Sequence, residues 1–181
     1  IELHERYARD AAFPGKAARF LRQLAVKCPR QQVTRDTVFQ EFHAKTGLAL
    51  SLLDDRQKLP REQIVEPLRR RIISQDAAVD AAADVISIAK ARLNDRTRPL
   101  ATLLFLGPTG VGKTHCAKAI AEFLFSDAER IVRFDMNEYV SPRAAPQLVG
   151  TFDAPEGLLT GAVRRQPFCV VLLDEIEKAH P

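Results

Sequence analysis

The stretch Gly107-Pro108-Thr109-Gly110-Val111-Gly112-Lys113-Thr114 decides the fold, because it fits the pattern G-x-x-x-x-G-K-[ST] at every fixed position. Glycines let the backbone turn so that successive N–H groups point at phosphate oxygens. The helix that begins at Gly112 is expected to aim its positive end at the same place. In such a loop Lys113 reaches the β- and γ-phosphates, and the Thr114 hydroxyl is a ligand of Mg²⁺. The stretch therefore predicts a site for ATP with Mg²⁺.

Apolar segments surround this loop in a regular alternation. A strand is expected at 103–106, an apolar helix after the loop to about Phe125, and further strands at 131–134 and 168–173. Strands that alternate with helices form a parallel sheet with helices on its faces, a context that a chance glycine-rich turn would lack. The sequence therefore predicts an α/β fold of the P-loop NTPase type, preceded by a small all-α segment.

A second motif follows one strand later. The run from Cys169 to Leu173 is apolar and ends in Asp174 and Glu175. Alone, such a run is weak evidence, because the start of a helix can have the same composition. After a phosphate loop it is the Walker B motif, in which Asp174 holds Mg²⁺ opposite Thr114 and Glu175 polarises the attacking water as a general base. The two motifs together predict ATP hydrolysis, with Glu175 as the catalytic residue.

The region before residue 76 is predicted to be helical, with several capping and breaking residues. A helix is expected to start at Pro14, which suits a first turn. Thr34 is expected to cap a helix that Gly47 ends, and Ser74 to cap another. A further helix is expected to be interrupted or kinked at Pro67.

Composition and cysteine spacing exclude several classes of protein. The net charge of +4 is compatible with a polyanion such as ATP and does not require nucleic acid. The cysteines Cys28, Cys116 and Cys169 have no metal-ligand spacing, and their odd number argues against a disulfide framework. No apolar run approaches the roughly 20 residues that a membrane span needs. A cytoplasmic protein is therefore expected, with no role for a membrane.

These motifs resemble those of the Clp group of AAA+ protein unfoldases and disaggregases, and specifically their second ATPase module. The resemblance rests on the phosphate loop, on Phe134-Asp135-Met136-Asn137-Glu138-Tyr139 and on the run from Val163 to Pro181. It implies a ring-forming homo-oligomer, expected to be a hexamer, that uses ATP and Mg²⁺ to act on polypeptide substrates. A peptidase or an adaptor protein would be a further partner.

The resemblance extends upstream of the loop. The segment 71–79 is similar to the one that lies against adenine in this family, with Ser74 where glycine is usual. This similarity implies that Ile72 and Ile73 line the base pocket. The alternative is that both are ordinary core residues.

The resemblance also divides the chain. Residues 1–28 would be the C-terminal helices of an upstream AAA+ lid, 29–70 a linker, and 71–181 an AAA+ large subdomain that is truncated after Walker B. The sensor residues, the arginine finger and the second lid of such a module would lie beyond Pro181. The chain alone is therefore expected to hydrolyse ATP negligibly, and the full-length protein to be an ATPase.

One loop departs from the family pattern. After residue 150 the family has a loop with a Gly-aromatic-Val-Gly tip that grips polypeptide in the pore of the ring. Here the stretch from Thr151 to Leu158 is shorter, and Phe152 is either a substitute aromatic or a packed core residue, with the core position favoured. The module is therefore expected to grip polypeptide poorly and to leave threading to another module.

Two other outputs stay open. One is an AAA+ ATPase that acts as a nucleic-acid loader or an assembly factor, and the other is a nucleotide-binding scaffold without turnover. Stimulation of ATP hydrolysis by unfolded protein would favour the unfoldase. Stimulation by DNA or RNA would favour the loader, and tight binding without hydrolysis would favour the scaffold.

Overall fold

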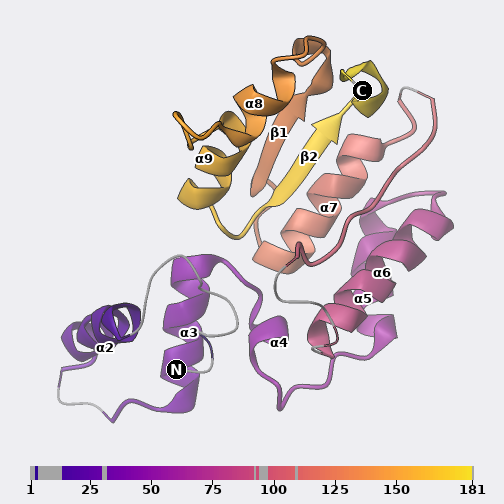
Figure 1. Cartoon of the computed structure of the whole chain (residues 1–181). Helices are drawn as coiled ribbons and strands as arrows, with labels where there is room; N and C mark the ends of the chain where they lie inside the picture. Colours follow the sequence, from indigo (N-terminus) through magenta and orange to yellow (C-terminus); the bar gives the residue numbers. More distant parts are fainter. Residues whose placement is uncertain are drawn as a thin grey trace.

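The computed structural model describes residues 3, 14–29, 32–91, 93, 98–108 and 110–180. Helices α2 to α6 form one end of the molecule, and a small sheet with α7, α8 and α9 forms the other (Figure 1). The elements of this region are α2 Gly15–Lys27, α3 Arg35–Thr46, α4 Leu50–Leu53, α5 Arg61–Arg71, α6 Asp76–Lys90, α7 Lys113–Phe125, β1 Ile131–Asp135, the 3-10 turn η1 Met136–Glu138, α8 Ala144–Val149, α9 Leu158–Arg165, β2 Val170–Asp174 and the 3-10 turn η2 Ile176–Lys178.

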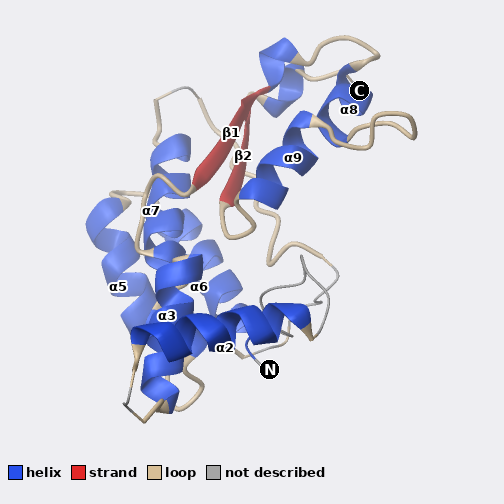
Figure 2. Cartoon of the chain, turned by 90° about the vertical axis from the view of Figure 1, so that its left-hand side faces the viewer, coloured by secondary structure: helices blue, strands red, loops and turns tan. Residues whose placement is uncertain are grey.

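The sheet is parallel, as predicted. β1 and β2 pair side by side in a register that runs from Ile131 opposite Val170 to Asp135 opposite Asp174. Helix α7 lies on one face of the sheet, and α8 and α9 lie on the other (Figure 2). The α/β fold with helices on both faces of a parallel sheet is thus confirmed. Both strands end at the same edge, which is where the acidic residues of the second motif lie.

The strand predicted at 103–106 does not form. Leu103 and Phe105 pack against the core, whereas Leu104 and Leu106 are 69% and 85% exposed. The segment therefore has the two-residue alternation of a strand. Among the described residues no strand is hydrogen-bonded to it, and an apolar pattern without a ladder partner does not make a strand.

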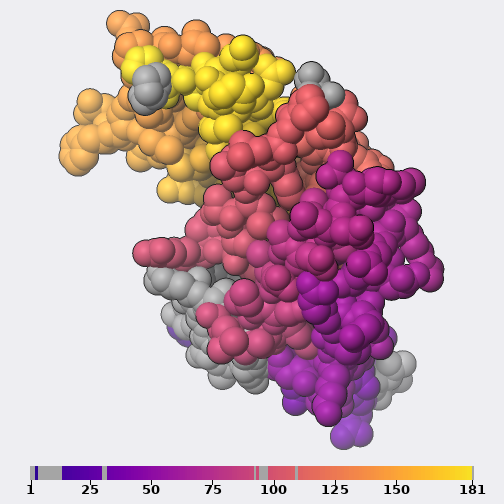
Figure 3. Space-filling view, turned by 90° about the vertical axis from the view of Figure 1, so that its right-hand side faces the viewer, coloured from indigo at the N-terminus to yellow at the C-terminus, as the bar shows by residue number. Residues whose placement is uncertain are grey.

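One hydrophobic core joins the helices from α2 to α7. In the space-filling view the purple, magenta and red segments of this part lie against one another (Figure 3). The largest fully buried side chains of this core come from α2, α3, α4, α5 and α6: Leu24, Phe42, Leu53, Ile64, Leu68, Val79 and Ile86. A smaller cluster of Met136, Tyr139 and Ala144 lies under η1 and α8. The predicted linker 29–70 therefore contributes to the same core as α6 and α7, while the predicted division of the chain stays a prediction.

The capping predictions have mixed outcomes. The Thr34 side chain accepts a hydrogen bond from the Thr37 amide at 3.3 Å, and Gly47 ends α3 with φ +76°, so both predictions are confirmed. The predicted cap at Ser74 is wrong, because α6 begins at Asp76 and Ser74 lies outside it with φ +57°. That left-handed backbone favours glycine, which agrees with the glycine usual at this position in the Clp group.

Helix α5 continues through Pro67, so the predicted interruption is wrong, while the alternative of a kink at Pro67 stays a prediction. Proline removes one backbone hydrogen bond from a helix. Here Ile64, Val65 and Leu68 are 0%, 8% and 1% exposed. Burial of this apolar face, at roughly 1.5–3 kcal/mol per side chain, outweighs the lost bond.

Cys116 is buried and Cys169 is half-buried. Cys116 is 3% exposed in α7, and Cys169 precedes β2. Burial raises the pKa of both thiols. Both side chains therefore stay protonated at neutral pH, which disfavours nucleophilic chemistry.

Arg130, which directly precedes β1, links the end of α3 to the sheet. Arg130 Nη1 donates a hydrogen bond of 2.6 Å to the Thr46 carbonyl, and the Ala49 amide donates to the Leu124 carbonyl of α7 at 2.8 Å. Gly47 lies directly against the guanidinium, since a Cβ added there would be 2.5 Å from Arg130 Cζ. The 46–49 segment and Arg130 are called the Arg130 anchor below.

None of the described helices has the length and apolar character needed to cross a membrane.

Candidate nucleotide site

The phosphate loop leads into α7 at the edge of the sheet where both strands end (Figure 1). Gly110 has φ +85°, and Gly112, which precedes the first residue of α7, has φ +98°. A Cβ is costly in this left-handed region, so these two positions require glycine. Thr109 lies outside the described residues. The N-terminal amides of α7 are thus directed toward the space that the loop encloses, where an anion is favoured.

The lysine of the loop bends back over it. Lys113 Nζ donates hydrogen bonds to the carbonyl oxygens of Gly107 at 2.7 Å and Pro108 at 3.0 Å. The ammonium group is therefore held at the mouth of the loop by neutral acceptors alone. A phosphate oxygen is a stronger acceptor for this cation than a carbonyl, so a nucleotide would replace these bonds with charge-assisted ones. Thr114 is half-buried in the first turn of α7.

Asp174 forms the last position of β2 and is paired with a cation. Its Oδ2 lies 2.6 Å from Arg133 Nη2, and the two side chains are 18% and 56% exposed, respectively. Arg133 belongs to β1, the neighbouring strand. The Asp174 carboxylate is thus half-enclosed by the sheet edge and partly neutralised by a side chain that faces solvent.

Glu175 follows β2 in the left-handed conformation, with φ +54° and ψ +48°. This backbone costs a residue other than glycine about 1–2 kcal/mol, and such strain is found mostly at functional sites. Glu175 Oε2 accepts a hydrogen bond of 2.6 Å from Asn137 Nδ2, and the same amide group donates to Asp135 Oδ1 at 2.8 Å. Asp174 and Glu175 therefore have separate partners, although they are adjacent in the sequence.

The sequence does not single out Arg133 or Asn137 as site residues. Asn137 stands in a run that carries the family resemblance, but its partner is 38 residues away along the chain. A usable signal does exist. Both residues lie at or near the end of the first strand, and parallel strands that pair place their carboxyl ends, and hence these polar side chains, at one edge.

The two isoleucines of the predicted base pocket differ in exposure. Ile72 is 6% exposed and belongs to the core, whereas Ile73 is 78% exposed. The segment lies beside the first turn of α7, since His115 Nε2 is 3.0 Å from the Arg71 carbonyl oxygen. Ile72 therefore has the environment of an ordinary core residue, and Ile73 has an open apolar face near the loop. Their contact with adenine stays a prediction.

The residues predicted to hold Mg²⁺ fit that ion by their chemistry. Mg²⁺ prefers oxygen ligands and is usually held by one or two protein groups together with phosphates and water. Thr114 offers a hydroxyl oxygen and Asp174 a carboxylate. This donor set suits a cation that arrives with a nucleotide rather than one held by a complete protein cage.

Phe152 is 99% exposed, so its predicted place in the core is wrong. The turn that carries it is closed by the Thr151 amide, which donates to the Ala154 carbonyl at 2.8 Å, and by the Ala154 amide, which donates to Thr151 Oγ1 at 3.1 Å. These bonds leave the Phe152 ring no neighbouring surface to pack on. A single exposed apolar side chain is common on protein surfaces, so the exposure of Phe152 leaves its ring available for contact but does not by itself identify a partner.

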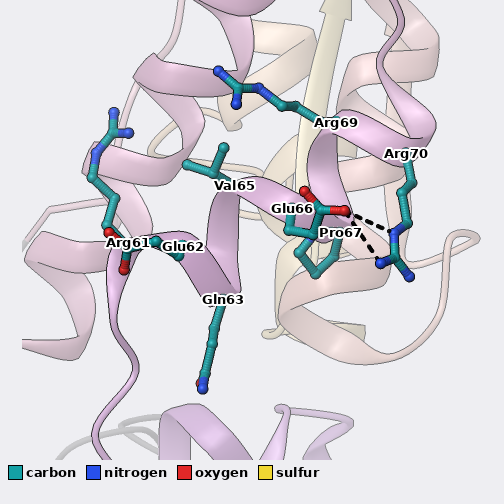
Figure 4. A pocket seen from close by; sticks show the side chains of 8 residues that line it. All are labelled: Arg61, Glu62, Gln63, Val65, Glu66, Pro67, Arg69 and Arg70. Atoms are coloured by element: carbon teal, nitrogen blue, oxygen red, sulfur yellow. Dashed lines mark hydrogen bonds and ion pairs between the residues drawn. The ribbon is translucent and has the colours of Figure 1, made fainter.

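A groove of about 640 Å³ runs along α5 and does not belong to this site (Figure 4). Its arginines are paired within the chain: Arg70 with Glu66 at 3.2 Å, Arg61 with Asp80 at 2.9 Å and Arg69 with Asp76 at 3.3 Å. Residues of α5 alone line it: Arg61, Glu62, Gln63, Val65, Glu66, Pro67, Arg69 and Arg70. The phosphate loop contributes none of its residues, so the nucleotide site is identified by the loop and the strand ends.

A glycine loop leads into α7, and at the same edge of the sheet β2 ends in Asp174, which Glu175 follows. This is the arrangement of a P-loop NTPase domain. The chain matches the family model described as AAA domain (Cdc48 subfamily) over residues 98–181. Its similarity to the Clp group is confirmed by the chaperone protein ClpB of Enterococcus faecalis, to which it is 45% identical over 164 residues. ClpB of Lactococcus lactis subsp. cremoris is 43% identical over 160 residues.

These alignments include most of this chain but only a small part of each relative. The alignments include 86% and 84% of this chain, which spans 18% of the length of each ClpB. Among solved structures, the closed state of Hsp104 with ATPγS and FITC casein matches with a TM-score of 0.75 and 29% identity, over 99% of this chain and 33% of Hsp104. The similarity to the ClpB proteins and to Hsp104 thus extends over most of this chain, which corresponds to a limited part of each of these relatives.

Proposed function

We propose that this chain is the nucleotide-binding part of an ATPase module in a Clp-type protein unfoldase or chaperone. In the full-length protein the module would hydrolyse ATP within a ring-forming homo-oligomer that acts on polypeptides. The observation that carries this proposal is the arrangement of Lys113 and Glu175: the lysine lies over the phosphate loop, and the glutamate is held by Asn137 at the same edge of the sheet. A cytoplasmic location and a peptidase or adaptor partner belong to the same proposal.

Each residue of the site has a task in this proposal. The loop amides and the start of α7 bind the phosphates, and Lys113 exchanges its carbonyl partners for phosphate oxygens. Thr114 and Asp174 hold Mg²⁺, which supplies positive charge to the transferred phosphoryl group when bound. Glu175 accepts a proton from the attacking water, and its hydrogen bond from Asn137 fixes where the carboxylate points.

The general base gives the first test. Glu175→Gln in the full-length protein should leave ATP binding at this site unchanged and lower its turnover by about 100-fold or more, as expected for removal of a general base. The measurement pairs fluorescent-ATP titration with steady-state phosphate release. Glu177→Gln, an identical change at an exposed position of η2, should keep wild-type turnover. Unimpaired hydrolysis by the Glu175 variant would exclude Glu175 as the base.

The nature of the output has its own test. Unfolded polypeptide should accelerate ATP hydrolysis by the full-length protein, whereas DNA and RNA should not. Acceleration by nucleic acid alone would instead favour a loader. Tight ATP binding with no turnover under any condition would favour a scaffold.

The exposure of Phe152 leaves its ring available for gripping, so a gripping role for this loop is the alternative to the weak grip expected from its short length. Phe152→Ala should lower the rate of polypeptide unfolding several-fold while ATP turnover persists, and Phe152→Tyr should restore the rate. The free energy of unfolding should stay within about 0.5 kcal/mol of wild type, because an exposed side chain contributes no packing. If the alanine variant unfolds substrates at the wild-type rate, threading belongs to another module.

A further inference from the structure

The register of the sheet brings charged residues together at the edge next to the phosphate loop. Asp135 and Asp174 are partners across β1 and β2, and like charges placed opposite one another destabilise a sheet. Arg133 lies two residues before Asp135, so its side chain leaves β1 on the same face. This face therefore carries two carboxylates and one guanidinium within a span of three register positions.

The two carboxylates have partners of different kinds. Asp135 Oδ1 accepts hydrogen bonds from the Asn137 amide at 3.1 Å and from Asn137 Nδ2 at 2.8 Å, which are both neutral donors. Asp174 has the charged donor, since Arg133 Nη2 lies 2.6 Å from its Oδ2. Asp174 is also the residue proposed to hold Mg²⁺. The carboxylate needed by the metal is thus the one that a protein cation already neutralises.

We propose that Arg133 is an internal cation that Mg²⁺ displaces from Asp174, so that this ion pair sets the Mg²⁺ concentration at which the module takes up ATP. The inference rests on the proposed function. A carboxylate oxygen that accepts a short charge-assisted hydrogen bond is less available to a metal or to its bound water. Arg133 therefore weakens the affinity of the site for Mg²⁺.

The exposure of the two side chains makes the exchange feasible. The Arg133 side chain is 56% exposed and the Asp174 side chain 18% exposed, so the guanidinium can leave toward solvent while the carboxylate stays in place. Asp135, on the same strand and the same face, offers the displaced guanidinium a second carboxylate. After the exchange each of the two aspartates would then have a cation next to it, Mg²⁺ at Asp174 and Arg133 at Asp135.

The test measures Mg²⁺ dependence of binding rather than activity. Fluorescent ATP at fixed concentration is titrated with Mg²⁺ in the full-length protein, and the binding that Lys113→Ala removes is assigned to this site. Arg133→Gln should lower the Mg²⁺ midpoint of that binding about five-fold, the size expected for loss of a partly exposed ion pair. Arg133→Lys, which keeps the charge but not the planar guanidinium, should give a Mg²⁺ midpoint between that of wild type and that of Arg133→Gln.

Each outcome has one meaning. A midpoint for Arg133→Gln that is equal to or higher than that of wild type overturns the inference. If the circular dichroism of the glutamine variant shows loss of fold, Arg133→Lys decides, and a midpoint at or above wild type overturns the inference in the same way. If wild-type binding has no component that Lys113→Ala removes, the proposed nucleotide site itself fails.

Discussion

Replacing Lys113 with alanine should weaken ATP binding at this site by about 100-fold or more, because two charge-assisted hydrogen bonds to phosphate, at roughly 1.5–3 kcal/mol each, are lost. The ammonium group already lies over the loop, 2.7 Å from the Gly107 carbonyl and 3.0 Å from that of Pro108. Few rearrangements are then needed when a nucleotide binds. The measurement is a fluorescent-ATP titration of the full-length protein, in which the binding stoichiometry should fall by one nucleotide per chain.

A matched control lies one turn further along the same helix. Lys118 is exposed on α7 and forms an ion pair of 3.0 Å with Glu129, away from the loop. Lys118→Ala removes the same charge from the same helix and should leave the affinity for ATP unchanged. Wild-type affinity in the Lys113 variant would refute the assignment of the phosphate loop.

The second large effect concerns the stability of the chain. Gly47→Ala should lower the free energy of unfolding by about 2 kcal/mol. Roughly half comes from placing alanine at φ +76°. The rest, about 1 kcal/mol, comes from displacing Arg130, whose Cζ would lie 2.5 Å from the new Cβ, from its hydrogen bond to the Thr46 carbonyl.

A double-mutant cycle separates these two causes. In an Arg130→Ala background the guanidinium is gone, so Gly47→Ala should cost only the backbone term of about 1 kcal/mol. Urea unfolding of the four proteins gives the coupling energy, which is expected to be about 1 kcal/mol. If the two effects are additive, the coupling energy is zero. The close contact between position 47 and Arg130 then does not contribute to the cost of Gly47→Ala.

The parts of the site that the sequence predicts are those fixed by a few adjacent residues. The glycines at 110 and 112 permit the left-handed backbone found at both positions, and α7 starts directly afterwards at Lys113. The pattern therefore carries its own local geometry. The roles of Thr34 and Gly47 are also fixed locally, because Thr34 caps the start of α3 and Gly47 ends the same helix.

The features that the sequence does not predict depend on partners far along the chain. Whether 103–106 forms a strand depends on a neighbouring strand rather than on its own apolar residues. Arg133 meets Asp174 because of the register of β1 and β2. Phe152 is apolar enough for a core, and only the closed turn around it shows that no core is within reach.

The continuous core from α2 to α7 has a mechanical consequence. Close-packed protein interiors have low compressibility, so a displacement at one end is transmitted rather than absorbed. Buried side chains of α3, α4, α5 and α6 share that core with Ala121 and Leu124 of α7, the helix that begins at the phosphate loop. If α7 tilts, α3 should therefore move with it as part of one rigid unit. A flexible linker between the two helices would not transmit that movement.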